Sequence, residues 1–256
     1  MKNIENFKNK GFVCSSLDAI PSDLIESART AVEEVRLGKY RTGVPPWTSI
    51  DQNLPSRLQR ITQIHIANHT ITELVKSSEV GKLAAEVSGS DTIKVWGSQL
   101  FYKPAGSSLG GNVGIHRDSQ HVPYFTKGML IAWIPLHSVD SHNGTINYVN
   151  GSHKWQRNLA FTGGDFQNLD QQRSRIQMFC SDTWDETSIK LEAGQFAIHD
   201  MHTLHFSSTN ESNQDRAALS FGLLTDEAEF NHEAPHYGYG DILNNPALCP
   251  TIFDGK

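Results

Sequence analysis

Residues 92–103, TIKVWGSQLFYK, begin the part of the chain that decides the fold. They are rich in β-branched and aromatic residues, and similar short segments follow, separated by clusters of Gly, Pro, Asn and Ser. Short strands in this arrangement are typical of an antiparallel sandwich or barrel, so we expect an all-β core. The later segments are MLIAWIPL at 129–136, GTINYV at 144–149, GQFAIHD at 194–200 and RAALSFGLL at 216–224.

Helical patterns precede this region. In LIESARTAVEEVRLGKY at 24–40, apolar residues recur every three or four positions, which predicts an amphipathic helix. A second helix is expected from about Thr70 to Val87, and Gly89 ends it. Between the two helices, the segment 41–57 is rich in Pro and polar residues, so we expect a long loop that binds a ligand or covers a site.

These patterns describe a single domain that spans residues 1–256. Its helical N-terminal part covers 1–90, its β core covers about 91–225, and a C-terminal tail covers 226–256. A less regular insert at roughly 154–190 is expected to lie over one end of the sheet.

The composition is that of a soluble globular chain. The 256 residues are 38% hydrophobic and 20% charged, with a formal net charge of −6. No run approaches the roughly 20 apolar residues of a membrane helix, and no apolar signal-peptide segment follows the first lysines, so we expect a cytoplasmic protein without membrane contact. The acidic balance without a basic stripe argues against a nucleic-acid partner. The three cysteines are far apart, and we expect them to be reduced.

Histidine stands out in this composition, because eight of the 12 histidines fall between His116 and His205. The most informative pattern among them is GIHRDS at 114–119. On an extended backbone, residues two apart share a face, so the side chains of His116 and Asp118 can converge on one metal ion. A third ligand must come from a distant strand. The segment 194–224 offers His199, His202 and His205.

The residues that follow these histidines favour His205. Eleven residues after it, Arg216 opens an alternating strand on which Arg216, Ala218 and Ser220 share one face. A guanidinium binds a carboxylate through two parallel hydrogen bonds, so this end of the pocket is expected to bind an acid. Two histidines and one carboxylate with open positions opposite them suit non-haem Fe(II) oxygenases. Zinc hydrolases use a similar set but do not need the arginine.

Five blocks of the sequence, taken in order, resemble the phytanoyl-CoA dioxygenase family of Fe(II)- and 2-oxoglutarate-dependent oxygenases. The similarity runs from about Gln99 to Leu224. The order of the blocks is more specific than any one of them. The blocks are LFYKPAG at 100–106, IHRD at 115–118, MLIAWIPL at 129–136, HNGTINYVNGSHKW at 142–155 and HFSSTNESNQDRAALS at 205–220.

The resemblance implies a double-stranded β-helix, the jelly-roll barrel of cupin-like proteins, with O2 and 2-oxoglutarate as cosubstrates. The implied Fe(II) ligands are His116, Asp118 and His205. The residues implied for 2-oxoglutarate are Arg216, which holds its distal carboxylate, and then Ser220, Gln99, Trp133 and Thr145.

The implied reaction is hydroxylation, or a related oxidation, of a small-molecule metabolite with release of succinate and CO2. Asp118 favours this reaction over halogenation, because halogenating relatives have a small residue in place of the carboxylate. Some residues depart from the family pattern, and none of them is an implied ligand or the arginine. Asn150, Gln195 and Phe206 stand where the family usually has Pro, Asp and Gly.

Several segments are expected to flank the open metal positions. They mix aromatic, amide and basic groups, which suits a small polar or amphipathic substrate. They are the loop 41–60, His121 and Tyr124 after the ligand pair, and the part of the insert with Trp184.

Two other classes of function stay open. One is a cupin-like metal-dependent hydrolase or isomerase, and the other is a non-catalytic binding protein on the oxygenase scaffold. The sequence does not indicate an oligomeric state.

Overall fold

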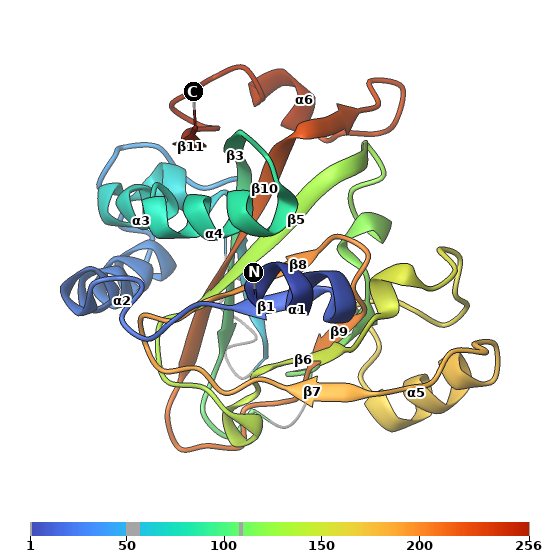
Figure 1. Cartoon of the computed structure of the whole chain (residues 1–256). Coiled ribbons are helices and arrows are strands. Elements are labelled where there is room, and N and C mark those ends of the chain that lie inside the picture. Colours follow the sequence, from blue (N-terminus) through green and yellow to red (C-terminus); the bar gives the residue numbers. More distant parts are fainter. Residues whose placement is uncertain (1, 50–56, 108–109, 256) are drawn as a thin grey trace.

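The computed structural model describes residues 2–49, 57–107 and 110–255, and two antiparallel sheets form its centre (Figure 1). The two sheets enclose a cluster of apolar side chains, with Trp133 from the larger sheet and Ile146 from the smaller one. The larger sheet has the order β1 (Phe12–Cys14), β8 (Ala197–Asp200), β5 (Phe125–Pro135), β10 (Arg216–Phe230), β3 (Thr92–Lys103) and β11 (Thr251–Asp254), and β2 (Gln59–Thr62) also pairs with β3. The smaller sheet has the order β4 (Val113–His116), β9 (His205–Ser207), β6 (Ile146–Val149) and β7 (Glu186–Ser188).

The path of the chain through these sheets is that of a double-stranded β-helix. From β3 to β10 the chain crosses between the sheets after every strand except β6, which is followed by its partner β7 in the same sheet. The strands β3, β5, β8 and β10 lie in the larger sheet, and β4, β6, β7 and β9 lie in the smaller one. The strands β1, β2 and β11 extend the larger sheet at its edges. The expected all-β core with the jelly-roll topology is therefore confirmed.

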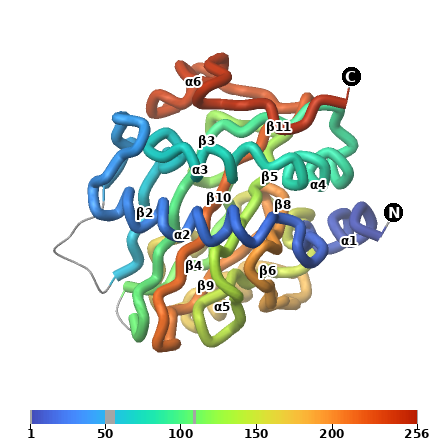
Figure 2. Tube along the Cα trace, turned by 90° about the vertical axis from the view of Figure 1, so that its left-hand side faces the viewer, coloured from blue at the N-terminus to red at the C-terminus, as the bar shows by residue number. Residues whose placement is uncertain are grey.

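Helices cover the outer face of the larger sheet. In Figure 2, α2 runs across the strands of this sheet, and α3 and α4 lie above it. Their apolar faces share one buried cluster with Leu100 of β3 and Leu219 of β10. The smaller α1 packs against α4. The bounds are α1 (Lys2–Lys10), α2 (Ser22–Arg36), α3 (His69–Val75) and α4 (Ser78–Ser88).

The prediction of one helix over 70–87 is wrong, because the chain forms two helices there. The break lies at Ser77, whose backbone is extended with φ −55° and ψ 117°. Leu74 before the break and Val80 after it are both fully buried in the same cluster. The break lets both short helices turn their apolar faces toward the sheet, and the apolar period alone did not reveal it.

The insert at 154–190 covers the outer face of the smaller sheet and contributes β7 to its edge. It was expected over one end of the sheet, but its helix α5 (Leu169–Gln177) packs against β4 in a cluster with Ile115 and Trp155. The amide of Gln172 bonds to Ile115 as a neighbouring strand would: its Oε1 accepts from the backbone N–H at 2.7 Å and its Nε2 donates to the carbonyl at 2.9 Å. This contact covers an edge of β4.

Most elements missed by the sequence analysis are too short to show a period. They include the nine-residue helix α1. They also include six strands of three or four residues each, which are β1, β2, β4, β7, β9 and β11. In the C-terminal region, α6 (Tyr239–Ile242) lies beside β3, and β11 pairs with the same strand. Four 3-10 turns complete the fold, η1 (Ile64–Ala67), η2 (Asp118–Gln120), η3 (Ser141–Asn143) and η4 (Ser152–Lys154).

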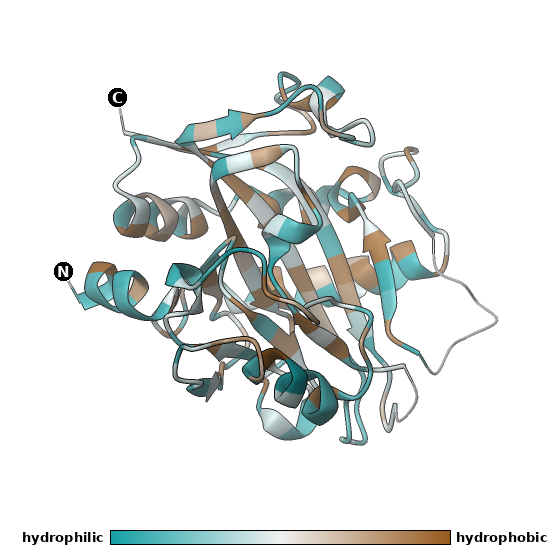
Figure 3. Cartoon of the chain, turned by 90° about the vertical axis from the view of Figure 1, so that its right-hand side faces the viewer, coloured by the Kyte–Doolittle hydropathy of each residue, from teal (hydrophilic) through white to brown (hydrophobic). Residues whose placement is uncertain are grey.

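The described part of the expected loop, 41–49, has no helix or strand, and residues 50–56 lie outside the described residues. In Figure 3, apolar residues gather along the strands, whereas the surrounding loops are mostly hydrophilic. Across the described ranges, no helix combines the length and the apolar composition required to cross a membrane.

We expect the Gln172→Ala substitution to destabilise the protein by about 2–3 kcal/mol, because it leaves a buried N–H and a buried carbonyl of β4 with fewer partners. The exposed neighbour Gln171→Ala is the matched control and should change the free energy of unfolding by less than about 0.5 kcal/mol. Urea unfolding of the two variants measures the difference. Equal effects would show that the Gln172 amide does not support β4.

Candidate functional site

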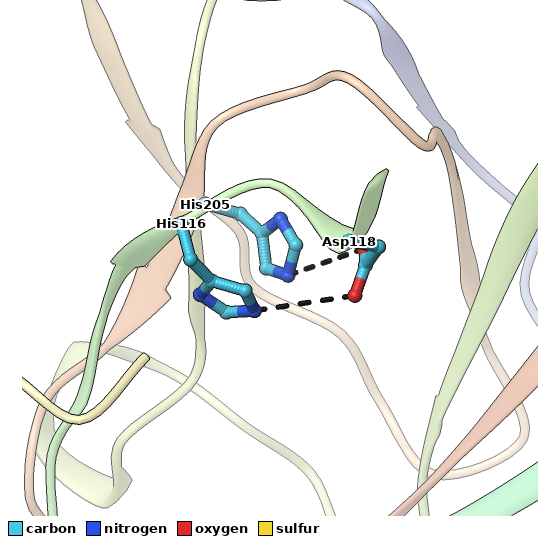
Figure 4. Close-up of side chains that lie close together, drawn as sticks. All are labelled: His116, Asp118 and His205. Carbon is cyan, nitrogen blue, oxygen red and sulfur yellow. Dashed lines mark ion pairs between the residues drawn. The ribbon is translucent and has the colours of Figure 1, made fainter. Parts of the chain in front are cut away.

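The strands β4 and β9 bring His116 and His205 together across the smaller sheet. The two residues are direct partners in the strand register, and their ring centroids lie 4.2 Å apart. Arg117 is extended, with φ −115° and ψ 141°, so Asp118 returns to the side of the chain on which His116 lies. Figure 4 shows the carboxylate of Asp118 facing both imidazoles.

These three side chains are spaced to hold one metal ion. One ligand atom from each of them lies within 4.8 Å of the others. Asp118 Oδ1 is 4.0 Å from His116 Nε2, and Asp118 Oδ2 is 3.6 Å from His205 Nε2. Two ligand atoms about 2.1 Å from a common metal lie at most about 4.2 Å apart, so the pairs need little movement to bind.

Backbone hydrogen bonds orient both imidazoles toward the common centre. The Nδ1 of His116 lies 2.7 Å from the carbonyl of Gly114, and the Nδ1 of His205 lies 3.0 Å from the carbonyl of Thr203. A carbonyl only accepts, so each Nδ1 carries the proton and each Nε2 offers a lone pair to the metal. The site is thus held in the tautomer that binds metal.

His199 supports the carboxylate of Asp118 from behind. It is almost fully buried, and its Nε2 lies 3.0 Å from Asp118 Oδ2. Its Nδ1 accepts a 2.9 Å hydrogen bond from the hydroxyl of Tyr148, whose ring stacks on Phe12 at 4.3 Å. Since the ionised carboxylate only accepts, His199 donates to it and is a neutral partner. From the sequence, His199 was a candidate ligand, and its contact with Asp118 could not be predicted.

Burial decides the protonation of these groups. Burial, with a contribution from His205, lowers the pKa of His116 to about 3, and burial lowers the pKa of His199 to about 4. Burial alone would raise the pKa of Asp118, but the electrostatic interaction with the His205 imidazole and the hydrogen bond from His199 hold it below its usual range. A neutral His116 beside an ionised Asp118 is the state that binds a divalent cation.

A second group of residues forms an anion-binding end of the site. Arg216 of β10 is 2% exposed, and its guanidinium donates to the carbonyls of Asn143, Phe101 and Gly144. Burial lowers its pKa to about 9. Among the described residues, no carboxylate lies within ion-pair distance of it. A buried guanidinium without a carboxylate partner fits a ligand that brings one.

Lys103 strengthens this interpretation, and the sequence analysis missed it. It is the direct partner of Arg216 in the register of β3 and β10, so the two cations share one face. It is fully buried, and its Nζ donates to Ser207 Oγ at 2.7 Å and to the carbonyl of Ser208. Burial and the charges of Arg216 and Arg60 lower the pKa of Lys103 well below its ordinary value. The signal was present in the quoted LFYKPAG block, because Lys103 ends β3 opposite the chosen arginine.

The structure distributes the other predicted cosubstrate residues over two adjoining cavities. The inner cavity contains Trp133 and Ser220 together with the three candidate ligands, and the Arg216 guanidinium lies 5.7 Å from the Trp133 ring centroid. Gln99 lies in the outer cavity, where its Nε2 is 3.4 Å from Thr62 Oγ1. Thr145 lines neither cavity, but its buried hydroxyl has no partner among the described residues and follows the Gly144 carbonyl that Arg216 contacts.

The outer cavity has a volume of about 530 Å³ and opens on the candidate ligands. It includes His121 and Tyr124, as expected for the turn after Asp118. Trp184 was expected near the metal but packs against Trp155 on the outer face of the smaller sheet. Phe206 also packs into that outer cluster, because it alternates with His205 along β9.

The sequence model of the family described as phytanoyl-CoA dioxygenase (PhyH) matches residues 7–218. The chain belongs to this family. The PhyH match covers the larger part of the helical region and the core as far as the start of β10. No curated protein sequence matches the chain.

Solved structures of similar fold support the PhyH architecture. The carbocyclase SnoK from nogalamycin biosynthesis is 19% identical with a TM-score of 0.75, and the match covers 98% of this chain and 95% of SnoK. The epimerase SnoN from the same biosynthesis is 16% identical with a TM-score of 0.70, covering 92% and 84% of the two chains. EctD from S. alaskensis is 17% identical with a TM-score of 0.69, covering 90% and 77%.

The buried histidines make the stability of this PhyH protein depend on pH. Unfolding returns the pKa of His116 and His199 toward 6.5, so the unfolded chain binds more protons between about pH 4 and 6.5. The free energy of unfolding should therefore fall as the pH falls through this range, by up to about 1.4 kcal/mol per pH unit for each histidine. Urea unfolding of metal-free protein tests this. His199→Gln should reduce the slope and the exposed His69→Gln should not, whereas a flat profile would contradict the burial argument.

We expect His199→Ala to weaken metal binding about 10- to 100-fold, because Asp118 loses the donor that orients it. Tyr148→Phe should have a smaller effect in the same direction, since it removes the bond that orients His199. Calorimetric titration with Co(II) measures both affinities. The control is His202→Ala, which loses a bond to Ser119 and no contact with Asp118. Unchanged Co(II) affinity in the His199 variant would exclude this role.

Proposed function

We propose that the protein is a non-haem Fe(II)- and 2-oxoglutarate-dependent dioxygenase that oxidises a small-molecule metabolite and releases succinate and CO2. One observation carries this proposal. Two buried cations, Lys103 and Arg216, lie opposite each other on neighbouring strands and have no carboxylate within ion-pair distance among the described residues. They adjoin the cluster of His116, Asp118 and His205. Like charges in this position destabilise a sheet, and an anion that binds between them offsets the repulsion and favours the protonated form of Lys103.

The residues of the chain have separate tasks in this reaction. His116, Asp118 and His205 hold the iron, which supplies the oxidising chemistry from O2 and 2-oxoglutarate when both are bound. His199 fixes the orientation of Asp118. Arg216, Lys103 and Ser207 bind the distal carboxylate of the cosubstrate, and Trp133 and Ser220 line the inner cavity around it. Thr145 contributes its unpaired hydroxyl, and Gln99 lies toward the substrate side.

The known proteins of similar fold support this assignment at the level of the family. The SnoN epimerase is described in a complex with Fe3+, alpha ketoglutarate and nogalamycin RO, and EctD is described with 2-oxoglutarate and 5-hydroxyectoine. Both are therefore associated with small molecules. We extend a small-molecule substrate to this chain by analogy with them. The acidic composition argues against a nucleic-acid partner, and the lack of a long apolar run or apolar signal segment favours a cytoplasmic location without a membrane partner.

The geometry does not favour the other two classes of function. A cupin-like hydrolase or isomerase would use the three ligands but has no need of two buried cations next to them. A binding protein without activity would not need the hydrogen bonds that hold His116 and His205 in the tautomer suited to metal.

Anaerobic titration with Fe(II) and 2-oxoglutarate tests the proposal. The wild type should give the weak visible charge-transfer band of the chelate, and admission of air with a suitable substrate should release succinate and CO2. His116→Ala should lose the band. Arg216→Gln should raise the 2-oxoglutarate concentration for half-formation of the band at least about tenfold, because it removes a charge-assisted pair.

The matched control is Arg41→Gln, since Arg41 pairs with Glu34 on the surface away from both cavities. It should leave the band unchanged. Survival of the band in His116→Ala would contradict the ligand assignment. Absence of 2-oxoglutarate turnover with every candidate metabolite would contradict the function.

A further inference from the structure

The outer cavity has two chemically different ends, and they describe the molecule that would fill it. One end is a group of aromatic rings from four separate segments of the chain. The other end is a single cation on β2. The metal ligands His116 and Asp118 lie on the wall of the same cavity. The aromatic rings belong to Trp47, Trp96, Tyr124 and Tyr239.

The aromatic end is a continuous surface of rings. Tyr239 lies 4.8 Å from Trp47 and 4.8 Å from Trp96 between ring centroids, and it stacks on Tyr124 at 5.8 Å with an interplanar angle of 21°. It belongs to α6, which lies near one end of β3 and β10 in Figure 1. Trp47 is 39% exposed, so one face of this group remains open to a ligand.

The sheet is locally adapted to hold Trp96 in this wall. The register between β3 and β10 shifts at Gly222, where Gly97 pairs with Gly222 but Val95 pairs with Leu223, so Trp96 is the extra residue of a bulge. Val95 packs in the buried cluster between the helices and the larger sheet, whereas Trp96 packs in a different cluster with Tyr124 and Phe125. A Cβ on Gly222 would lie 2.1 Å from Trp96 Nε1, so only glycine leaves room for the indole. A bulge and a glycine thus place one ring beside the cavity.

The cationic end is Arg60. It pairs with Phe101 across β2 and β3, its guanidinium lies 5.5 Å from the Phe101 ring centroid, and both residues line the cavity. Asp165 also lines this wall, and its negative charge interacts with Arg60 although the two are farther apart than an ion pair. The remaining titratable residues on the wall are Asp118 and the histidines near the metal. Among the described residues no carboxylate lies within 4 Å of Arg60, whereas Arg29, Arg36, Arg41 and Arg173 each pair with at least one.

The distance between the two ends follows from the strand itself. Gly97 lies beside the Tyr239 ring, and Phe101 lies beside Arg60, four residues further along β3. At about 3.4 Å per residue, the two ends are about 14 Å apart. Between the two ends, β3 and β10 contribute Gln99, Ser220 and glycines 97 and 222 to the lining of the cavity, and none of these is charged.

We propose that the primary substrate of this site is an elongated molecule with a flat, apolar ring system at one end and an anionic group at the other. The rings stack against the aromatic wall, and the anionic group binds Arg60. The middle of the molecule is then presented to the metal ligands on the same wall. This inference rests on the proposed function only for the identity of the reaction. The shape and charge of the cavity do not depend on that function.

Two fluorescent probes that share one ring system test the proposal. Anilinonaphthalene sulfonate carries an anion on fused rings, and N-phenylnaphthylamine has the rings without the anion. With Fe(II) and 2-oxoglutarate bound under nitrogen, the wild type should bind one equivalent of the sulfonate, more tightly than the neutral probe. Arg60→Gln should weaken binding of the sulfonate about tenfold and leave binding of the neutral probe unchanged.

Arg175→Gln is the matched control. Arg175 lies 5.6 Å from the Phe161 ring centroid, a geometry close to that of Arg60 over Phe101, but it is outside the cavity. It should change neither affinity. Trp47→Ala, which removes an exposed ring from the aromatic wall, should weaken both probes.

The proposal is overturned if the wild type binds neither probe, if Arg60→Gln affects both probes equally or neither, or if Trp47→Ala leaves both affinities unchanged. The charge-transfer band separates this outcome from a failure of the proposed function. If Arg60→Gln keeps the band but the probes do not discriminate, the substrate class is wrong and the oxygenase assignment stands. If the wild type forms no band, the oxygenase assignment fails whatever the probes do.

Discussion

The pairing of β4 with β9 is the constraint on which the candidate metal centre depends. The distance between His116 and His205 is set by their position as direct partners in this pair. Strands of four and three residues provide few ladder bonds of their own, so their position depends on what flanks them. The Gln172 amide bonds to β4 on one side, and β6 pairs with β9 on the other. The insert on the outer face therefore supports the candidate metal ligands although it contributes none of them.

The proposed cosubstrate end imposes an opposite demand on the fold. Lys103 and Arg216 are buried side by side, which costs desolvation energy and adds repulsion between like charges. Carbonyl groups and Ser207 partly satisfy their donors, but no described carboxylate neutralises them. A ligand that neutralises both cations binds the folded state alone, and so it stabilises that state. The affinity for a carboxylate ligand and the stability of the ligand-free protein are thus coupled through Lys103 and Arg216.

The sequence alone was sufficient for the fold class and for the groups whose spacing is local. The segment 92–103 coincides with β3, and the two-residue spacing of His116 and Asp118 places them on one side. Arg216 could be chosen because it opens a long alternating strand. Roles that depend on tertiary contacts were not readable. His199 shows its function only through its contacts with Asp118 and Tyr148, and these come from three segments that no local pattern connects.

Phe101 explains how one site can keep two anions apart. A 2-oxoglutarate carboxylate at Arg216 and an anionic substrate at Arg60 would compete for the same cations if nothing separated them. The backbone carbonyl of Phe101 accepts from Arg216, whereas its ring faces the Arg60 guanidinium, and the residue lines both cavities. Phe101 thus contacts the two guanidinium groups through different parts of the residue, and an anion that moved from one to the other along its ring would lose hydration without gaining a partner.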